Sequence, residues 1–273
     1  MSRQQRANVN RTWSRPEQLR APAFRIIGNI YYVGNQGVSC HLVTSDEGHL
    51  LIDTAFATTV PLLLESIQAM GFDPGDIRLI LHTHGHVDHV GGTRRMVEAT
   101  GAKTALHRLD IERVEKGTPL TCAYYVYGIE DFETFSVDLP LEGGEVFEVG
   151  GTTIHVHHTP GHTPGVCTFE LKVPCQGHSV TAGLFGGPGQ WTFEKAHRSQ
   201  GYPGDIAAYG RTLEYLKTLW VDVPLGSHPD HNRTFQKWEA LKSGPEVNPF
   251  VDPLGWKASI EARERLFQRY RDH

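Results

Sequence analysis

The segment LHTHGHVDH (residues 81–89) decides both the fold and the chemistry that this sequence predicts. The apolar run DIRLIL (76–81) that leads into it has the character of a buried strand. The run GGTRRMVEATG (91–101) that follows has the spacing of a helix. The polar segment between them therefore predicts a loop that joins a strand to a helix, a position where binding and catalytic residues often lie.

The side chains of this loop indicate metal binding. His84 and His86 are two residues apart, so their rings lie on one face of an extended chain. Asp88 and His89 follow where the chain must turn toward the helix. Imidazole and carboxylate groups are ligands that zinc and similar ions accept. The loop offers three imidazoles and a carboxylate, more than one tetrahedral ion needs once other segments contribute, so the pattern points to two ions.

Two later segments each place a histidine after a predicted strand. TPGHTPG (159–165) puts His162 in a tight turn, and GSHP (226–229) puts His228 at another strand end. Loops at strand ends can gather on one edge of a sheet, so these distant segments can share one site. A surface histidine cluster is the alternative interpretation. A surface cluster does not require the pattern His-x-His-x-Asp-His at a strand-to-helix junction. This pattern therefore favours a metal site.

The rest of the chain alternates between the two periodicities. Strand-like runs fill residues 24–53 and 145–183, and helical spacing covers 58–70, 205–219 and two C-terminal segments near 232–242 and 254–271. This order predicts two sheets, each covered by helices, in one α/β domain. We expect residues 1–23 to form a polar N-terminal arm and residues 24–273 to form a single domain.

Four further residues are candidates for contacts with metal ligands or with a substrate. His82 shares a face with His84, although a hydrogen-bonded structural role is an alternative for it. Tyr125 lies in a segment (117–140) without clear periodicity, which is either a surface loop or a pocket wall. Phe185 and Trp191 begin a Gly/Pro-rich loop, where they line an apolar pocket or pack within their own loop.

Composition and charge exclude several classes of function. The chain has 273 residues, with 26 Lys plus Arg and 31 Asp plus Glu, giving a net charge of 26 − 31 = −5. Such a chain is a poor candidate for nucleic-acid binding, and no apolar run is long enough to span a bilayer. The early arginines precede no apolar segment, so we expect a cytoplasmic protein with a small-molecule substrate. The oligomeric state stays open.

The motifs together resemble the metallo-β-lactamase superfamily. The resemblance rests on LLIDT (50–54), HTHGHVDHVGG (82–92), HTPGHTPG (158–165) and GSH (226–228), in that order. It implies an αββα sandwich, in which two mixed sheets are flanked by helices and hold a binuclear site at one edge. It further implies that His84, His86 and His162 bind a first metal, and that Asp88, His89 and His228 bind a second. Asp53 matches an acidic position beside the metal loop, with a capping carboxylate as the alternative role.

One departure from the family pattern narrows the resemblance. Many members have an Asp that bridges the metals after the strand matching VTAG (180–183), and one β-lactamase subclass has a Cys there. This chain has neither, and it looks most like the third subclass of metallo-β-lactamases. That subclass commonly has serines nearby that hold the substrate carboxylate. Here Leu184, Phe185, Gly186 and Gly187 offer no side-chain donor, which predicts weak anchoring of a β-lactam carboxylate.

These features predict a hydrolase with two zinc ions, or another divalent metal, that opens a cyclic amide or ester. The bond would be of the β-lactam or lactone kind, attacked by a metal-bound hydroxide, with Asp88 as the catalytic carboxylate that binds the second ion and orients the nucleophile. Two alternatives within the superfamily remain: a thioesterase like glyoxalase II and a metal-dependent oxidoreductase like the iron dioxygenases. Zinc supports hydrolysis and redox-active iron supports oxygen chemistry, so metal analysis separates the last alternative from the others.

Overall fold

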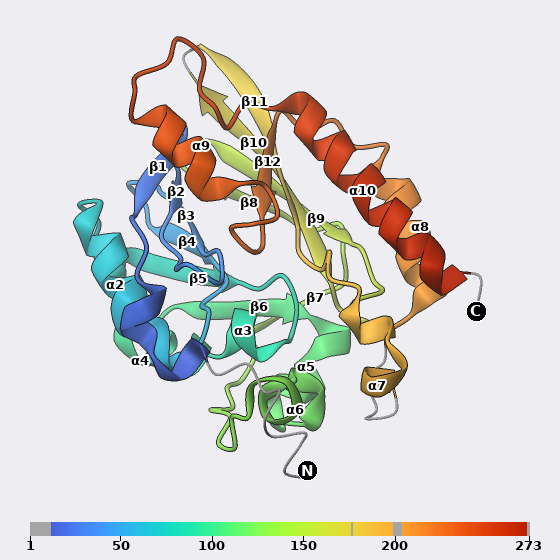
Figure 1. The fold of residues 1–273 in the computed structure, drawn as a ribbon. Helices are drawn as coiled ribbons and strands as arrows, with labels where there is room; N and C mark the ends of the chain where they lie inside the picture. Colours follow the sequence, from blue (N-terminus) through green and yellow to red (C-terminus); the bar gives the residue numbers. More distant parts are fainter. Residues whose placement is uncertain (1–11, 176, 199–203, 272–273) are drawn as a thin grey trace.

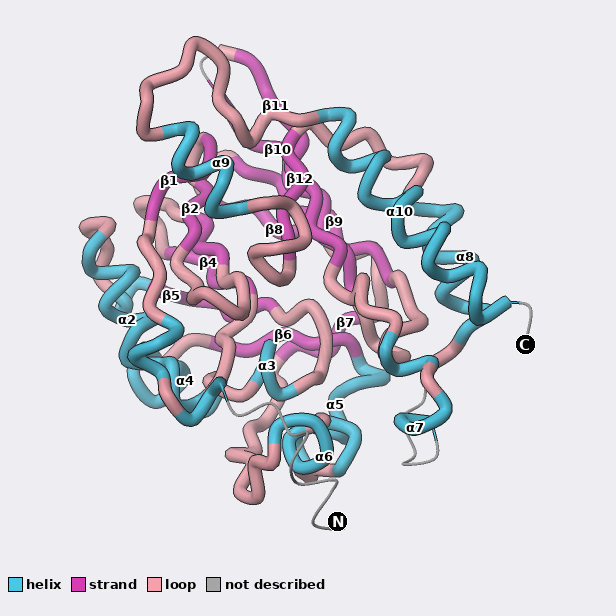
Figure 2. Tube along the Cα trace, viewed as in Figure 1, coloured by secondary structure: helices cyan, strands magenta, loops and turns pink. Residues whose placement is uncertain are grey.

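The structure is a computed structural model, and it describes residues 12–175, 177–198 and 204–271. Two β-sheets stack face to face, and helices cover the outer face of each (Figures 1 and 2). The helices α2 (Val60–Ala69) and α4 (Thr93–Thr100) lie on one side of this stack, and α8 (Ile206–Leu216) and α10 (Pro253–Arg271) lie on the other. The predicted αββα sandwich is confirmed.

The first sheet has seven strands in sequential order. Its first four strands pair antiparallel, and the pairs from β4 to β7 are parallel. Parallel neighbours need a crossover connection, and helices supply it between β4 and β5, between β5 and β6, and between β6 and β7. The strands are β1 (Phe24–Ile27), β2 (Ile30–Tyr32), β3 (His41–Val43), β4 (His49–Ile52), β5 (Ile77–Leu81), β6 (Lys103–His107) and β7 (Leu139–Leu141).

The second sheet has five strands in the order β12-β11-β10-β9-β8. Only the β11–β12 pair is parallel among them, and α8 forms its crossover. In β9 the side chains alternate between buried and half-buried, as expected for a strand with one face in the core. The strands are β8 (Val146–Val149), β9 (Thr152–His158), β10 (Cys167–Cys175), β11 (His178–Phe185) and β12 (Val223–Gly226).

The hydrophobic core lies between the two sheets. Ile52 and Leu81 from the first sheet pack there with Ile154, Phe169 and Leu184 from the second. Each fully buried aliphatic or aromatic side chain of this kind stabilises the fold by about 1.5–3 kcal/mol. Because this apolar core holds the strands in place, polar residues can occupy the loops at one edge of the sandwich.

Short helices fill the connections. Residues 117–140, which show no clear period, contain two short helices and the start of β7, and each of these elements is too short to show a period. The remaining helices are η1 (Thr12–Ser14), η2 (Pro16–Leu19), η3 (Ala57–Thr59), η4 (Pro74–Asp76), α3 (Val87–Val90), α5 (Arg108–Glu115), η5 (Pro119–Thr121), α6 (Ala123–Tyr127), η6 (Trp191–Phe193), α7 (Lys195–Arg198) and α9 (Thr234–Leu241).

The part of the N-terminal arm that the structure describes lies against α6 and η3. The indole of Trp13 donates to the Tyr127 carbonyl at 2.6 Å, and the Thr58 hydroxyl donates to the Trp13 carbonyl at 2.6 Å. The division into an arm and a single domain stays a prediction. Among the described helices, none is long and apolar enough to cross a membrane.

His41 in β3 makes folding stability depend on pH. The ring is 2% exposed, and burial lowers the pKa of His41 to about 4, although the Asp53 charge opposes this effect. The unfolded chain binds this proton near pH 6.5, so the stabilising contribution is complete above that pH and is lost as pH falls toward 4. We expect a loss of about 3 kcal/mol from this group at pH 4.

Urea unfolding between pH 7 and 4 tests the role of His41. The variant His41→Met should show a shallower fall in unfolding free energy than the wild type, because the titrating ring is gone. His178→Met replaces an exposed histidine and is the matched control, with an unchanged slope. Equal slopes for wild type and His41→Met would contradict the assignment.

Candidate metal centre

Six side chains from three segments meet at one edge of the sandwich. The loop after β5, together with α3, carries four of them; the turn between β9 and β10 carries one, and the segment after β12 carries the last. They form two groups of three whose ligand atoms lie within 4.8 Å of one another: His84, His86 and His162 in the first, and Asp88, His89 and His228 in the second. These are the two groups that the motif resemblance implied.

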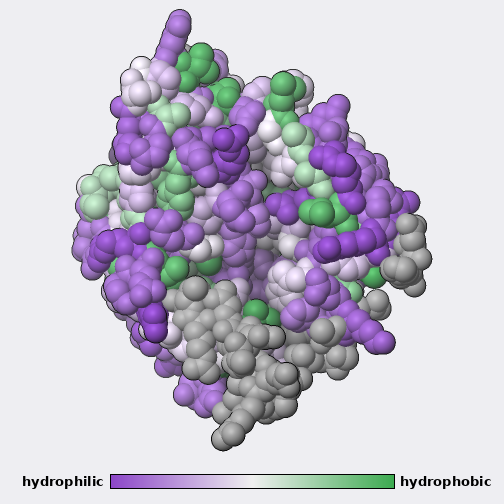
Figure 3. All heavy atoms as spheres, in the orientation of Figure 1, coloured by the Kyte–Doolittle hydropathy of each residue, from purple (hydrophilic) through white to green (hydrophobic). Residues whose placement is uncertain are grey.

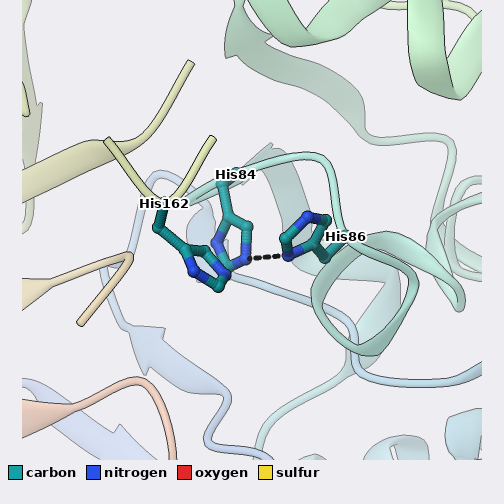
Figure 4. A group of neighbouring side chains, drawn as sticks. All are labelled: His84, His86 and His162. Carbon is teal, nitrogen blue, oxygen red and sulfur yellow. Dashed lines mark hydrogen bonds between the residues drawn. The ribbon is translucent and has the colours of Figure 1, made fainter. Parts of the chain in front are cut away.

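The first trio consists of imidazoles that face one another. Figure 4 shows the three rings turned toward a common point, with His162 approaching from the opposite loop. Nε2 of His84 and Nδ1 of His86 are 3.2 Å apart, and the His162 ring centroid lies 4.6 Å from that of His86. All three side chains are buried. The arrangement therefore presents three nitrogen atoms to one small volume.

The second trio is built around the Asp88 carboxylate. Its Oδ2 atom lies 3.5 Å from Nε2 of His89 and 3.6 Å from Nε2 of His228. The ring centroids of His84 and His89, one from each trio, are 4.3 Å apart, so the two trios are adjacent. The geometry thus offers two neighbouring sites, one with three nitrogens and one with two nitrogens and an oxygen.

Burial keeps most of these histidines neutral. It lowers the pKa of His84 and His86 well below the usual value and lowers the pKa of His162 to about 4. It also lowers the pKa of His228. Burial acts in the same direction on His89, but there the charges of Asp88 and Asp53 outweigh it and raise the pKa. Neutral imidazole is the form that binds a metal ion.

Hydrogen bonds outside the trios fix the orientation of three rings. Nδ1 of His162 pairs with the Gly189 carbonyl at 2.8 Å, and Nδ1 of His228 pairs with the Gly37 carbonyl at 2.7 Å. Nδ1 of His89 pairs with Oδ2 of Asp53 at 2.8 Å. A carbonyl or carboxylate partner holds the proton on Nδ1, which leaves Nε2 free to act as a ligand.

Asp53 ties the metal loop to the end of β4. Besides His89, its carboxylate accepts hydrogen bonds from the Thr83 backbone N–H at 2.8 Å and from the Thr83 hydroxyl at 2.7 Å. The contacts with His89 and His82 lower the pKa of Asp53 even though its burial alone would raise it. Asp53 also has a φ of 60°, a strained conformation for a residue other than Gly, which these contacts hold in place.

A second carboxylate, which the sequence analysis missed, joins two ligand-bearing segments. Asp110 on α5 is fully buried and accepts from the Gly85 N–H at 2.9 Å, from the Thr163 hydroxyl at 2.6 Å and from the Gly165 N–H at 3.0 Å. Nε of Arg113 lies 3.3 Å away. A Cβ on Gly165 would lie 2.6 Å from Asp110 Cγ, so only Gly fits. Asp110 therefore links the loop of His84 and His86 to the turn of His162.

The donor set of both trios fits zinc. Zinc binds imidazole nitrogen and carboxylate oxygen, and catalytic zinc sites use three protein ligands with one position left open. Each trio supplies three such atoms, and the rings carry the outer hydrogen bonds that zinc-binding histidines usually have.

The other candidates lie at different distances from the trios. The Trp191 ring centroid is 5.4 Å from those of both His86 and His162, so Trp191 forms a wall of the first trio. His82 is fully buried and lies beside Asp53, with Nδ1 3.7 Å from Oδ1. Phe185 is 5% exposed and packs with Tyr209 in the cluster under α8 and α10, and it also lines a pocket beside α10.

Tyr127, two residues after the candidate Tyr125, lies near Asp88. The Tyr125 ring packs edge-on against Tyr124, with ring centroids 5.3 Å apart. Burial raises the pKa of Tyr127 well above its usual value, and the nearby Asp88 carboxylate raises it further. The sequence showed a tyrosine cluster here, but no local pattern distinguishes its members.

Comparisons with known proteins agree with this geometry. Residues 33–174, just over half of the chain, match the sequence model of the metallo-beta-lactamase superfamily. The N-acyl homoserine lactonase AttM of Rhizobium johnstonii is 25% identical over 258 residues, which cover 83% of this chain and 86% of that protein. A hydroxyacylglutathione hydrolase of Anaeromyxobacter dehalogenans is 34% identical over 95 residues, and this match covers only 35% of this chain and 29% of that protein.

Two solved structures share the fold over nearly their whole length. The metallo-beta-lactamase FEZ-1 of Legionella gormanii is 32% identical with a TM-score of 0.84, covering 92% of this chain and 95% of that one. LRA-12, a class B3 di-zinc metallo-beta-lactamase from an Alaskan soil metagenome, is 28% identical with a TM-score of 0.81, covering 96% of this chain and 97% of that one. The predicted resemblance to the third subclass is confirmed.

Proposed function

The chain belongs to the metallo-β-lactamase superfamily, and from this premise we propose that it is a binuclear zinc hydrolase that opens a cyclic amide or ester. The observation that carries the proposal is the pair of adjacent trios with zinc-type donors. His84, His86 and His162 would hold one ion, and Asp88, His89 and His228 would hold the other.

Bound at these trios, two zinc ions would supply a water of lowered pKa and polarise the scissile carbonyl. The chain contributes the geometry of the reaction. The Asp88 carboxylate accepts a hydrogen bond from the attacking water and orients it toward the carbonyl carbon. Trp191 covers one side of the first trio, which excludes bulk water there. Asp53 holds the imidazole of His89 in the tautomer that leaves Nε2 available.

The relatives support a strained or activated carbonyl as the substrate. One relative is named as a lactonase, another as a hydroxyacylglutathione hydrolase, and the structural neighbours are β-lactamases. Lactone, β-lactam and thioester share a carbonyl carbon that a nucleophile attacks directly. Within this set we favour the cyclic substrates, since AttM is matched over most of its length and both structural neighbours are β-lactamases.

A hydrolysis screen with the zinc-loaded protein tests the proposal. The screen should contain N-acyl homoserine lactones, a penicillin, a cephalosporin, a carbapenem and a glutathione thioester. We expect turnover of at least one cyclic substrate, and loss of that turnover on treatment with a chelator. Turnover of the thioester alone would favour the thioesterase alternative. Absence of all hydrolysis, together with tightly bound iron, would favour an oxidoreductase.

His228→Ala should weaken the second trio selectively. His228 is the only member of that trio outside the central loop, and its loss leaves two donors where three are needed. We expect Co²⁺ affinity at this site to fall by at least about 100-fold while the first site keeps its ion. The reciprocal variant His162→Ala should affect the first site more. Equal weakening of both sites in a spectroscopic cobalt titration would contradict the grouping.

A further inference from the structure

A pocket of about 650 Å³ lies beside the metal centre, between α10 and the segment that follows β12. Figure 3 shows the face between α9 and α10, where hydrophilic and hydrophobic side chains lie side by side. The lining combines apolar residues such as Leu225 and Trp256 with nine polar or charged ones, among them Ser227, His231 and Arg263. A hollow of this size and mixed character has the properties of a small-molecule site.

The pocket adjoins segments that support both trios. Ser227 and His231, on either side of His228, line it, and the His231 ring centroid is 4.9 Å from that of His228. Pro188 lines the opposite side, one residue before the Gly189 carbonyl that orients His162. A ligand bound at the metal centre therefore lies next to this pocket.

Arg263 places a cation with unused donors in this pocket. Within the described part of the chain, no carboxylate oxygen lies within 4.0 Å of its guanidinium nitrogens, and the guanidinium donates one hydrogen bond, from Nη1 to the Pro188 carbonyl at 3.2 Å. That carbonyl already accepts a shorter bond, 2.7 Å, from the Tyr209 hydroxyl. A guanidinium has five N–H donors in a planar fork, so most of them remain available to a ligand.

The other charges around the pocket leave a positive balance. Lys237 is paired with Asp252 at 3.0 Å. Asp230 is 85% exposed and lies 3.9 Å from His231, and Arg233 also lines the pocket. Three cations thus face two carboxylates in a protein whose net charge is −5. An anion gains more from this pocket than from the surrounding surface, and partial burial strengthens the interaction.

We propose that the pocket binds a carboxylate of the ligand, held by the Arg263 guanidinium, with the apolar part of that ligand against Leu225 and Trp256. Arginine binds carboxylates through two parallel N–H···O bonds, which a lysine or a hydroxyl does not reproduce. The loop after β11 offers no side-chain donor at residues 184–187, and Arg263 on α10 would take over the task from a different element. The assignment of this carboxylate to a substrate rests on the proposed hydrolase function.

Calorimetric titration of the zinc-loaded protein with 4-phenylbutyrate and with its neutral amide tests the proposal. The wild type, Arg263→Met, Arg263→Lys and the control Arg265→Met are compared; Arg265 is exposed on the same helix. We expect Arg263→Met to weaken binding of the carboxylate by at least about tenfold and to leave the amide unchanged. Arg263→Lys should lie between, and Arg265→Met should match the wild type.

Three outcomes would overturn the proposal: no carboxylate binding to the wild type, no loss in Arg263→Met, or an equal loss for carboxylate and amide. The last would mean that Arg263 only supports the loop at Pro188; zinc content and melting temperature of Arg263→Met show whether that loop is intact. Because the titration involves no turnover, its result is independent of the hydrolysis screen. Arg263-dependent binding without hydrolysis would keep the subsite and reject the proposed function, and the converse would reject only the subsite.

Discussion

Asp88→Asn should lower kcat by about 10³-fold or more on whichever cyclic substrate the hydrolysis screen identifies, while the fold remains intact. Asp88 is the only carboxylate among the six proposed ligands, and Nε2 of both His89 and His228 lies within 3.6 Å of its Oδ2. Asn keeps the size and shape of the side chain. It loses the charge that holds a second ion, and an NH₂ donor replaces one of the two acceptor oxygens that can orient the attacking water.

Three measurements together decide this prediction: steady-state kinetics, metal content and thermal melting. We expect an unchanged melting profile of the metal-free protein, reduced occupancy of the second site and near-complete loss of turnover. Asp46→Asn, an exposed carboxylate in the turn before β4, is the matched control and should behave as the wild type. A near-normal kcat with both metals retained would show that Asp88 has a different role.

Asp110→Asn should destabilise the protein by about 3–5 kcal/mol, because it leaves a buried charge without its partner. The side chains of Asp110 and Arg113 are 0% and 3% exposed. Three further donors, from Gly85, Thr163 and Gly165, also point at the Asp110 carboxylate. The Asn amide would bring an N–H₂ group toward these donors, so at least one of them would lose its acceptor.

Urea unfolding of the metal-free protein measures this effect directly. The double variant Asp110→Asn/Arg113→Met should recover part of the lost stability, because both buried charges are then gone. We also expect weaker zinc binding at the first trio in Asp110→Asn, since the carboxylate links the segments that carry its ligands. A loss below about 1 kcal/mol would show that water replaces the carboxylate and that Asp110 does not brace the two segments.

The sequence carries much of the fold and of the metal centre because both are encoded in local patterns. Apolar strands followed by helical segments predict the covered sheets, and the strand ends predict where His84, His162 and His228 lie. Family resemblance supplied the grouping into two trios, and the structure brings together the same three residues in each.

The parts that the sequence does not show are contacts between distant segments. Asp110 lies on α5, 25 residues after Gly85 and 53 residues before Thr163, and nothing in the local pattern links the three. Arg263 belongs to a polar C-terminal helix in which each arginine looks alike until α10 is placed over the pocket. At Phe185 the local pattern allows two interpretations, because an apolar residue at a strand end suits a pocket wall and a core equally well.

Elemental analysis of protein purified without chelator tests the central claim most directly. The two trios predict about two zinc ions per chain, removed by a chelator and taken up again on reconstitution. A protein with no bound transition metal, and with no uptake when zinc is supplied, would contradict the binuclear centre and with it the proposed hydrolase.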